Sequence, residues 1–185
     1  MRIFLAVFPP PAVQDAAFAM LEALRPLGHG VSWVKRDNLH YTLRFLGEID
    51  EAHAQRAIEA AREAAAATPA FDAALGAAGA FPTPRRARVL WIGMAAGGPQ
   101  LVALAGRLAT ALERHGWEAE ARPFSPHLTI GRVREPSDWS GPLASAAKGG
   151  AAFRVENLAV VHSQLHPRGS IYSILENAPL ATAPV

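Results

Sequence analysis

Alternating polar and apolar positions mark two short strands that share a motif. The first strand reads NLHYTLRFLG and the second reads SPHLTIGR. Each contains a histidine, one spacer and a threonine: His40 with Thr42, and His127 with Thr129. Side chains two residues apart on a strand share a face, so each motif places an imidazole and a hydroxyl on one side. We expect the apolar sides of both strands to face a core and the polar sides to line a cleft.

The same alternation assigns a face to the other residues of the first strand. Arg44 falls on the side of His40 and Thr42. The opposite side is apolar and consists of Leu39, Tyr41, Leu43 and Phe45. In the second strand, Leu128 and Ile130 take the apolar side.

Hydrophobic spacing elsewhere predicts further helices and strands. Apolar residues recur at helical spacing after Pro11, Asp50 and Gly98, which predicts helices that end near Leu24, Ala67 and His115. Short apolar runs predict strands at residues 2–8, 71–81, 88–94, 153–165 and 170–175. The order strand, helix, His-x-Thr strand therefore occurs twice. This repetition predicts two similar lobes, each giving one His-x-Thr strand to a shared cleft.

Length and composition fit a single globular domain. The chain has 185 residues, half of them hydrophobic, and a formal net charge of only +2. We expect one domain over residues 1–185, with two internal lobes that are not separable. The small positive charge is compatible with an anionic ligand, although a protein that coats nucleic acid is normally more basic.

The sequence contains no cysteine, which excludes disulfides, thiolate chemistry and cysteine-based zinc sites. The apolar run from Ile3 to Phe8 is too short for the core of a signal peptide. No stretch reaches the roughly 20 apolar residues that a membrane-spanning helix needs. We therefore expect a cytoplasmic protein without a membrane partner.

Two imidazoles facing one cleft suit acid–base chemistry, because histidine ordinarily titrates near pH 6.5. One neutral ring takes a proton from a nucleophile while the other, protonated, gives one to a leaving oxygen. The hydroxyls of Thr42 and Thr129 are suited to hydrogen bonding with phosphate oxygens, and Arg132 is suited to a bidentate phosphate contact. This scheme needs no metal and no cofactor. The remaining histidines show no zinc-binding spacing and are interpreted as structural.

Arg132 presents a geometric difficulty. It lies an odd number of positions after His127, so in a regular strand its side chain would point to the opposite face. A β-bulge at Gly131 would turn Arg132 back into the cleft, and we take this as the hypothesis. Phe8 and Tyr41 are further candidates for substrate contact through stacking on a base, although each is as easily a core residue.

With both motifs in place, the chain resembles the two-histidine phosphoesterases, and within them the bacterial RNA 2′,3′-cyclic phosphodiesterases, also called 2′-5′ RNA ligases. The resemblance covers nearly the whole chain. It includes RIFLAVFPP, VSWV, NLHYTLRFLGEID, GAFPTPRRARVLWIGM and RPFSPHLTIGRVR, followed by Ser163, Leu165, Gly169, Tyr172 and Leu175. Arg36-Asp37 and Gly131 depart from the residues common in the family, but neither departure is at a motif position.

The resemblance implies a bilobal α+β fold, with antiparallel sheets facing a central cleft and helices on the outside. It implies hydrolysis of RNA 2′,3′-cyclic phosphate ends to 2′-phosphomonoesters, and an ATP-independent reverse reaction that forms 2′-5′ linkages. His40 would be the proton donor and His127 the proton acceptor, with Thr42, Thr129 and Arg132 on the phosphoryl oxygens. A positive charge on Arg132 beside His127 would favour the neutral base. The partners expected are RNA ends or cyclic nucleotides, and the protein is expected to be a monomer.

Two alternatives stay open at this point. The chain could be a non-catalytic module that binds RNA ends or nucleotides with the same fold. It could also be a phosphodiesterase for another small cyclic phosphate. Intact histidine and threonine at all four motif positions argue against a pure binding module, while the sequence does not separate one cyclic phosphate from another.

Overall fold

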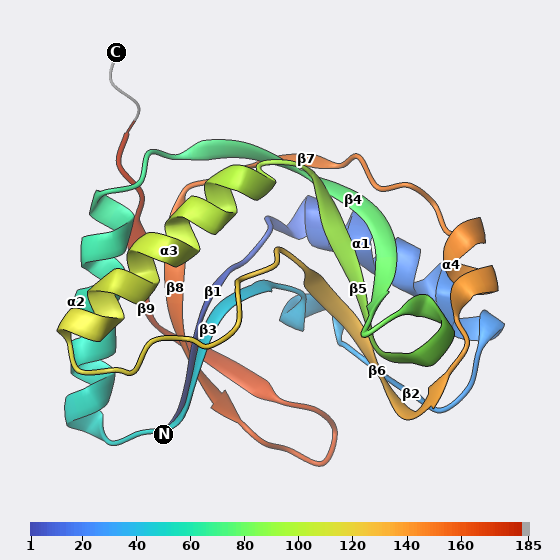
Figure 1. Ribbon diagram of the computed structural model, residues 1–185, viewed down its shortest axis with the longest axis horizontal. Helices are drawn as coiled ribbons and strands as arrows, with labels where there is room; N and C mark the ends of the chain where they lie inside the picture. Colours follow the sequence, from blue (N-terminus) through green and yellow to red (C-terminus); the bar gives the residue numbers. More distant parts are fainter. Residues whose placement is uncertain (183–185) are drawn as a thin grey trace.

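One antiparallel sheet, bent into two halves, is the centre of the molecule in the computed structural model, which describes residues 1–182 (Figure 1). The first half contains, in spatial order, β3 (Tyr41–Glu48), β1 (Arg2–Val7), β8 (Asn157–Gln164) and β9 (Ile171–Pro179). The second half contains β6 (Leu128–Ser137), β5 (Ala87–Ala96), β4 (Phe71–Phe81) and β7 (Ala152–Val155). A short strand, β2 (Val31–Trp33), also pairs with β6. The last residues of the expected 1–185 domain, 183–185, lie outside the described part of the chain.

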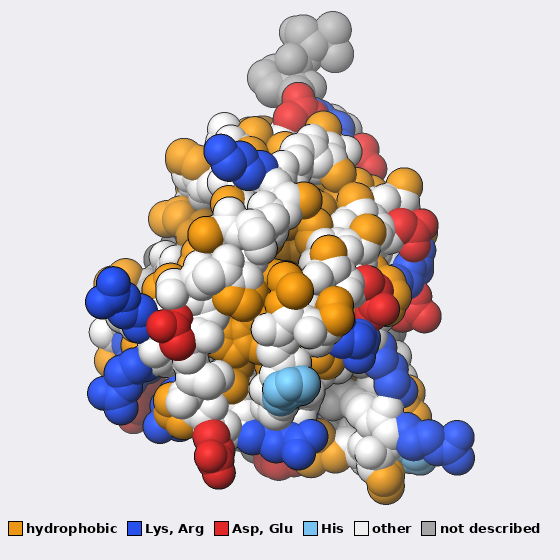
Figure 2. All heavy atoms as spheres, turned by 90° about the vertical axis from the view of Figure 1, so that its right-hand side faces the viewer, with side chains coloured by type: hydrophobic (Ala, Val, Ile, Leu, Met, Phe, Trp, Pro, Cys, Tyr) orange, Lys and Arg blue, Asp and Glu red, His pale blue; other side chains and the backbone are white. Residues whose placement is uncertain are grey.

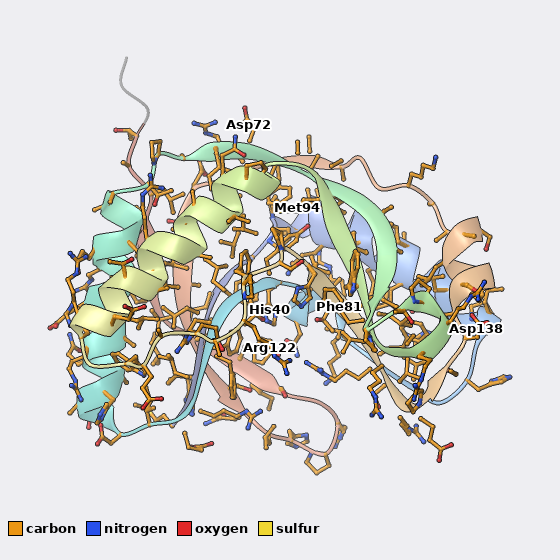
Figure 3. All side chains as sticks on the ribbon, viewed as in Figure 1. His40, Asp72, Phe81, Met94, Arg122 and Asp138 are labelled. Atoms are coloured by element: carbon orange, nitrogen blue, oxygen red, sulfur yellow. The ribbon has the colours of Figure 1, made fainter. Side chains whose placement is uncertain are left out.

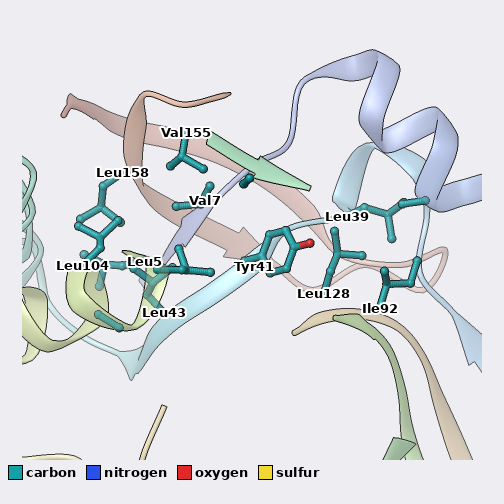
Figure 4. Close-up of a cluster of buried hydrophobic side chains, with 14 of the residues drawn as sticks. Leu5, Val7, Leu39, Tyr41, Leu43, Ile92, Leu104, Leu128, Val155 and Leu158 are labelled. Atoms are coloured by element: carbon teal, nitrogen blue, oxygen red, sulfur yellow. The ribbon is translucent and has the colours of Figure 1, made fainter. Parts of the chain in front are cut away.

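The two halves join where β3 meets β6. Within the described residues, these strands pair at one position, Tyr41 opposite Leu128. Both side chains are fully buried, and Figure 4 shows them next to each other in the core. The residue before each of them is a motif histidine, so the junction places His40 and His127 at the boundary between the halves.

The predicted repetition is confirmed in three dimensions. β1 is followed by α1 (Pro11–Leu24) and then by β3, its antiparallel neighbour. β5 is followed by α3 (Gly98–Arg114) and then by β6, again its antiparallel neighbour. Proline in the first turn suits both helix starts, since its missing N–H costs nothing there. Gly97, just before α3, has φ +83°, a conformation that favours glycine. The bilobal α+β fold inferred from the sequence is therefore correct.

Two long helices cover the outer face of the first half. α2 (Glu51–Ala66) begins after Asp50, whose carboxylate accepts the backbone N–H of His53 at 2.8 Å. α2 packs on α3 and on β8 and β9. The buried face of α2 consists of alanines, whereas that of α3 consists mainly of leucines, so small side chains of one helix meet larger ones of the other. Among the described residues, no helix is both long and apolar enough to cross a membrane.

Shorter elements complete the chain. They are α4 (Ser140–Ser145) and the 3₁₀ turns η1 (Arg25–Leu27), η2 (Arg36–Asn38) and η3 (Pro84–Arg86). The basic residues of η3 are exposed in a turn. On the side of the molecule turned toward the viewer in Figure 2, Lys and Arg side chains stand mainly around the edge of the face.

The strand predicted over residues 153–165 is wrong as a single element. It is two strands, β7 and β8, separated by the exposed Glu156. β7 pairs with β4 at one end of the sheet, whereas β8 pairs with β1 in the other half. A continuous apolar run does not reveal that its two parts belong to different neighbours.

The face assignment along β3 also needs correction. Leu5 pairs with Arg44 and Ala6 pairs with Thr42, so Leu43 is an extra residue and forms a bulge. From this point the alternation is reversed. Arg44 points away from the cleft and pairs with Glu120 at 2.9 Å. Phe45, expected in the core, is 49% exposed.

Candidate active site

His40 and His127 lie on one face of the sheet, at the junction of its halves. Extending the Tyr41–Leu128 register by one residue on each side sets His40 opposite Thr129 and Thr42 opposite His127. The two histidines are therefore diagonal neighbours, a relationship that puts two residues about 7–8 Å apart across an antiparallel pair. Burial is the main cause of the lowered pKa of His40, and a positive charge on the nearby His127 lowers it further. The structure brings the two predicted motifs together.

Both imidazole rings are oriented by the same kind of hydrogen bond. Nδ1 of His40 lies 2.7 Å from the carbonyl oxygen of Asn38, and Nδ1 of His127 lies 2.7 Å from that of Ser125. A carbonyl oxygen only accepts, so Nδ1 carries the proton and donates in both rings. Each neutral ring therefore keeps an unprotonated Nε2 for chemistry. The repeated local geometry follows from the repeated motif.

Thr42 is in direct contact with the reactive nitrogen of His40. Its Oγ1 lies 2.8 Å from Nε2, to which the hydroxyl donates when the ring is neutral. The Asn38 side chain, in turn, donates to the carbonyl oxygen of Ser170 at 2.8 Å. The residue just before β9 therefore supports the segment that holds the His40 ring.

Aromatic side chains enclose His40. Phe4 stacks on the imidazole with ring centroids 4.8 Å apart, and the Phe8 ring is tilted at 5.2 Å. The Tyr172 ring approaches edge-on at 5.5 Å. Burial lowers the pKa of His40 to about 4, and the hydrogen bond to Asn38 only partly opposes this effect. The unliganded ring is therefore neutral at neutral pH.

His127 is supported by a different aromatic pair. Its ring is nearly perpendicular to that of Phe81, with centroids 5.0 Å apart, and Phe81 packs on Trp91 at 5.1 Å. The Trp91 ring lies directly on Gly79, where a Cβ atom would come within 2.3 Å of a ring carbon. Glycine at this position therefore allows Trp91 and Phe81 to reach their places beneath His127. In Figure 3, His40 and Phe81 lie near the middle of the molecule, between its two halves.

Arg132 faces the cleft because the strand is irregular beside Gly131. Leu90 pairs with Gly131 but Trp91 pairs with Thr129, so the extra residue in β6 is Ile130, one position before the Gly131 that the sequence analysis indicated. A Cβ on Gly131 would lie 2.7 Å from a methyl group of Val31, which explains the glycine. After the irregularity Arg132 is exposed on the side of Thr129, while its neighbours in the strand are buried.

Tyr172 lies beside the motif histidine His40, whereas the sequence analysis named it only as part of the family resemblance and gave it no place in the site. It pairs with Ser163 in the β8–β9 hairpin and contacts the rings of Phe4 and His40. Burial raises its pKa, and the positive charge of Arg132 opposes this effect, which places Arg132 on the same side of the cleft. Only the pairing of β9 with β8, and of β8 with β1, brings Tyr172 here. The spacing of the motifs carries no such signal.

The proposed substrate contact of Tyr41 is wrong. Its side chain is fully buried, and its ring stacks on Phe153 at 6.4 Å in the core. Phe8, by contrast, is half-buried beside His40. Within residues 1–182, no group of three or more His, Asp or Glu residues is placed to hold a metal ion.

The sequence of this chain matches one protein family and several known proteins over most of its length. A family model described as the 2′-5′ RNA ligase superfamily matches residues 9–167. The chain is 32% identical to an RNA 2′,3′-cyclic phosphodiesterase of Thermotoga maritima over 176 residues, covering 95% of this chain and 93% of that protein. It is 33% identical to the protein of that name in Thermus thermophilus over 185 residues, covering 97% and 90%.

Solved structures share the arrangement of elements. A crystal structure of a Thermus thermophilus protein superimposes with a TM-score of 0.84 at 30% identity, covering 98% of this chain and 99% of that one. Escherichia coli LigT, crystallised with 3′-AMP, superimposes with a TM-score of 0.72 at 26% identity, covering 97% of each chain.

Proposed function

Because the chain belongs to the 2′-5′ RNA ligase superfamily, we propose that it hydrolyses RNA 2′,3′-cyclic phosphate ends to 2′-phosphomonoester ends. The observation that carries this proposal is the matched pair of imidazoles. Both rings have Nδ1 bound to a carbonyl oxygen and Nε2 left for the cleft. Relatives named as RNA 2′,3′-cyclic phosphodiesterases align over nearly the full chain, which supports the same chemistry here.

In the proposed reaction, His127 is the base. Its Nε2 takes a proton from water as the water oxygen attacks phosphorus, in line with the departing O3′. The P–O3′ bond breaks, the new P–O bond forms, and the 2′-phosphate remains on the same ribose. Nδ1 of His127 donates to Ser125, so the ring is fixed with Nε2 unprotonated before the reaction begins.

His40 is the proposed acid and gives a proton to O3′. The low pKa of the unliganded ring means that the proton must arrive with the substrate. A bound phosphate is an anion, and an anion next to a buried imidazole favours the charged ring. Substrate binding therefore favours protonation of His40. The surrounding aromatic side chains keep the His40 ring neutral when the cleft is empty.

Three side chains are proposed to hold the phosphoryl oxygens. The hydroxyls of Thr42 and Thr129 donate from the two motif strands, and Arg132 supplies two parallel N–H groups. When His40 takes up its proton, its Nε2 becomes a donor, and the Thr42 hydroxyl is released to turn toward the phosphate. All the groups in this scheme belong to the chain itself, so we propose a reaction that is independent of metal.

We further propose that the protein acts as one domain and as a monomer, with RNA as its substrate. The catalytic pair supports a single domain, because each half of the sheet supplies one histidine. The family also suggests the reverse reaction, in which a 5′-hydroxyl replaces water and a 2′-5′ linkage forms.

A chelator-treated enzyme assay tests the proposal. The protein is incubated with 2′,3′-cyclic AMP and with a short RNA bearing a 2′,3′-cyclic phosphate, in the presence of excess EDTA. We expect both to give 2′-phosphomonoesters. Binding of these ends without turnover would favour a non-catalytic module. Turnover of the mononucleotide with an untouched RNA end would favour another small cyclic phosphate as the substrate.

A further inference from the structure

The cleft face of the first half of the sheet continues from His40 to the far end of β1. Arg2 and Phe4 lie on the same side of this strand, and Phe4 stacks on the His40 ring. Phe45 pairs directly with Phe4, so its ring lies on the same face, where it is 49% exposed. Beyond His40, therefore, this face carries an exposed phenyl ring and an arginine.

The guanidinium group of Arg2 lies over the Phe45 ring, 4.7 Å from its centroid. The residue paired with Arg2 across the sheet is Glu48, and opposite charges at such a position attract each other. The Glu48 carboxylate, however, lies 3.4 Å from the Met1 ammonium group instead. Within residues 1–182, the Arg2 side chain has no ion pair and no hydrogen bond, so its charge is available to a ligand in the cleft.

Arg2 and Arg132 both lie near Tyr172. Burial raises the pKa of Tyr172, while the positive charges of Arg132 and Arg2 lower it, and such an effect weakens with distance. Tyr172 pairs with Ser163, and extending the β1–β8 register by one residue sets Ser163 beside Arg2. The cleft around Tyr172 therefore receives two guanidinium groups, one from each half of the sheet.

Two guanidinium groups suit a ligand with two phosphates. In the proposed reaction, Arg132 holds the cyclic phosphate on the 2′ and 3′ oxygens of the last ribose. The next phosphate of an RNA chain is attached to the 5′ oxygen of the same ribose. A protein that reads both must therefore place a cation on each side of one nucleoside, and a guanidinium group suits phosphate because it offers two parallel N–H groups. The contact with Phe45 holds Arg2 in position, which reduces the entropy lost on binding.

We propose that Arg2, positioned by Phe45, binds the phosphodiester that joins the last nucleotide of an RNA to the nucleotide before it. The inference rests on the proposed function, in which the cyclic phosphate lies at the two histidines. It goes further by making Arg2 a specificity residue for RNA ends, because a nucleoside 2′,3′-cyclic phosphate lacks this second phosphate. Ile174 pairs with Val161, which pairs with Phe4, so its exposed side chain offers apolar surface on the same face to the preceding nucleoside.

Three substrates that differ only on the 5′ side test this assignment. They are adenosine 2′,3′-cyclic phosphate, the same nucleotide with a 5′-phosphate, and the dinucleotide ApA with a 2′,3′-cyclic phosphate. We expect wild-type kcat/KM to be about tenfold higher for the dinucleotide than for adenosine 2′,3′-cyclic phosphate, as for one hydrogen-bonded contact to a charged group. The 5′-phosphate alone should recover part of this preference. Added salt should reduce the preference, because screening weakens contacts to phosphate.

Variants assign the preference to particular side chains. Arg2→Gln should lower the ratio of kcat/KM for the dinucleotide to that for adenosine 2′,3′-cyclic phosphate about tenfold and make this ratio less dependent on salt. Phe45→Leu should lower the ratio by a smaller factor, because Arg2 keeps its charge but loses the ring beneath it. Arg56→Gln is the matched control, since the Arg56 guanidinium also lies over an aromatic ring, that of Trp117 at 5.8 Å, but belongs to α2 on the outer side. Circular dichroism and the melting temperature establish that each variant is folded.

Several results would overturn the inference. Equal wild-type kcat/KM for all three substrates would show that no second phosphate is bound. An unchanged ratio in Arg2→Gln would show that the phosphodiester binds elsewhere, and equal losses for all three substrates would show that Arg2 supports the catalytic pair instead. A lower ratio in Arg56→Gln would assign the effect to net charge. Each of these results leaves the hydrolase function intact, whereas a wild-type protein that hydrolyses none of the three substrates would contradict the proposed function.

Discussion

Tyr41 and Leu128 pair across the junction of β3 and β6, and each directly follows a motif histidine. Because both side chains are anchored in the core, the preceding imidazoles are carried on the opposite face of the sheet. The separation of the two imidazoles is thus set by one buried pair of residues.

Removing either imidazole should abolish most of the activity. His40→Ala and His127→Ala are each expected to lower kcat/KM for 2′,3′-cyclic AMP by about 10²–10⁴-fold, the usual contribution of a positioned acid or base. His29→Ala is the control, because His29 is exposed at a turn outside the cleft. Retention of a tenth of wild-type activity in both cleft variants would contradict the two-histidine scheme.

The stability of the free protein should depend on pH through His40. Its pKa is about 4 in the folded state and about 6.5 when unfolded, so the unfolded chain binds more protons between these values. Stability is therefore lost as the pH falls from 6.5 toward 4. His40→Gln should be less acid-sensitive than wild type in urea unfolding, by an amount on the order of 2–3 kcal/mol at pH 4.

The same group should respond to an anionic ligand. In an NMR titration, adenosine 2′-monophosphate is expected to raise the pKa of His40, because the phosphate favours the charged ring. An unchanged pKa with the nucleotide bound would remove the reason for assigning His40 as the acid.

Arg132 should stabilise the transition state, because the irregular strand beside Gly131 directs its side chain into the cleft. Arg132→Gln is expected to lower kcat by about 10²-fold, as for the loss of one donor to a developing charge. Arg134→Gln, two residues further along the same strand, should have little effect. Equal rates for Arg132→Gln and wild type would show that the guanidinium does not touch the phosphate.

Gly79 should be intolerant of a side chain. A methyl group there would overlap the Trp91 ring, so Gly79→Ala is expected to cost about 1–3 kcal/mol of stability. The same change should reduce the hydrolysis rate, because Trp91 supports Phe81 and Phe81 supports His127. Gly93→Ala, whose Cβ would lie 3.3 Å from the same ring, should have a smaller effect.

The two halves of the sheet should unfold together. Trp33, Trp91 and Trp139 belong to or pack near the second half, while Trp117 contacts His53 and Arg56 at the start of α2. In Trp117→Phe, fluorescence reports the second half and far-ultraviolet circular dichroism reports the whole chain. We expect the two urea transitions to coincide, and separate midpoints would argue for independent domains.

Sequence patterns predicted the parts of this structure that depend on local alternation. Periodicity and repetition predict the two motif strands, the helix that precedes each of them, and the position of both motifs at one cleft. A bulge beside Gly131 was anticipated, because Arg132 required it. The bulge at Leu43 does not follow from the sequence, because the alternation in NLHYTLRFLG does not show that Leu43 lacks a partner in β1.

Long-range pairing accounts for the remaining differences. The division of residues 153–165 between two ends of the sheet depends on neighbours far away in the chain. Tyr172 likewise reaches His40 only through strand order. The low pKa of His40 arises from enclosure by side chains on three separate strands or loops, and no local pattern describes such an enclosure.

The order of strands in the sheet determines what happens when the chain is divided into two fragments. A break after α2 would leave His40 on the first fragment and His127 on the second, so neither fragment alone would hold both motif histidines. The second fragment would nevertheless supply β8, which pairs with β1 of the first fragment, and β9, which pairs with β8. Reassembly of such fragments would restore turnover, making the enzyme a candidate complementation reporter whose signal is cyclic phosphate hydrolysis.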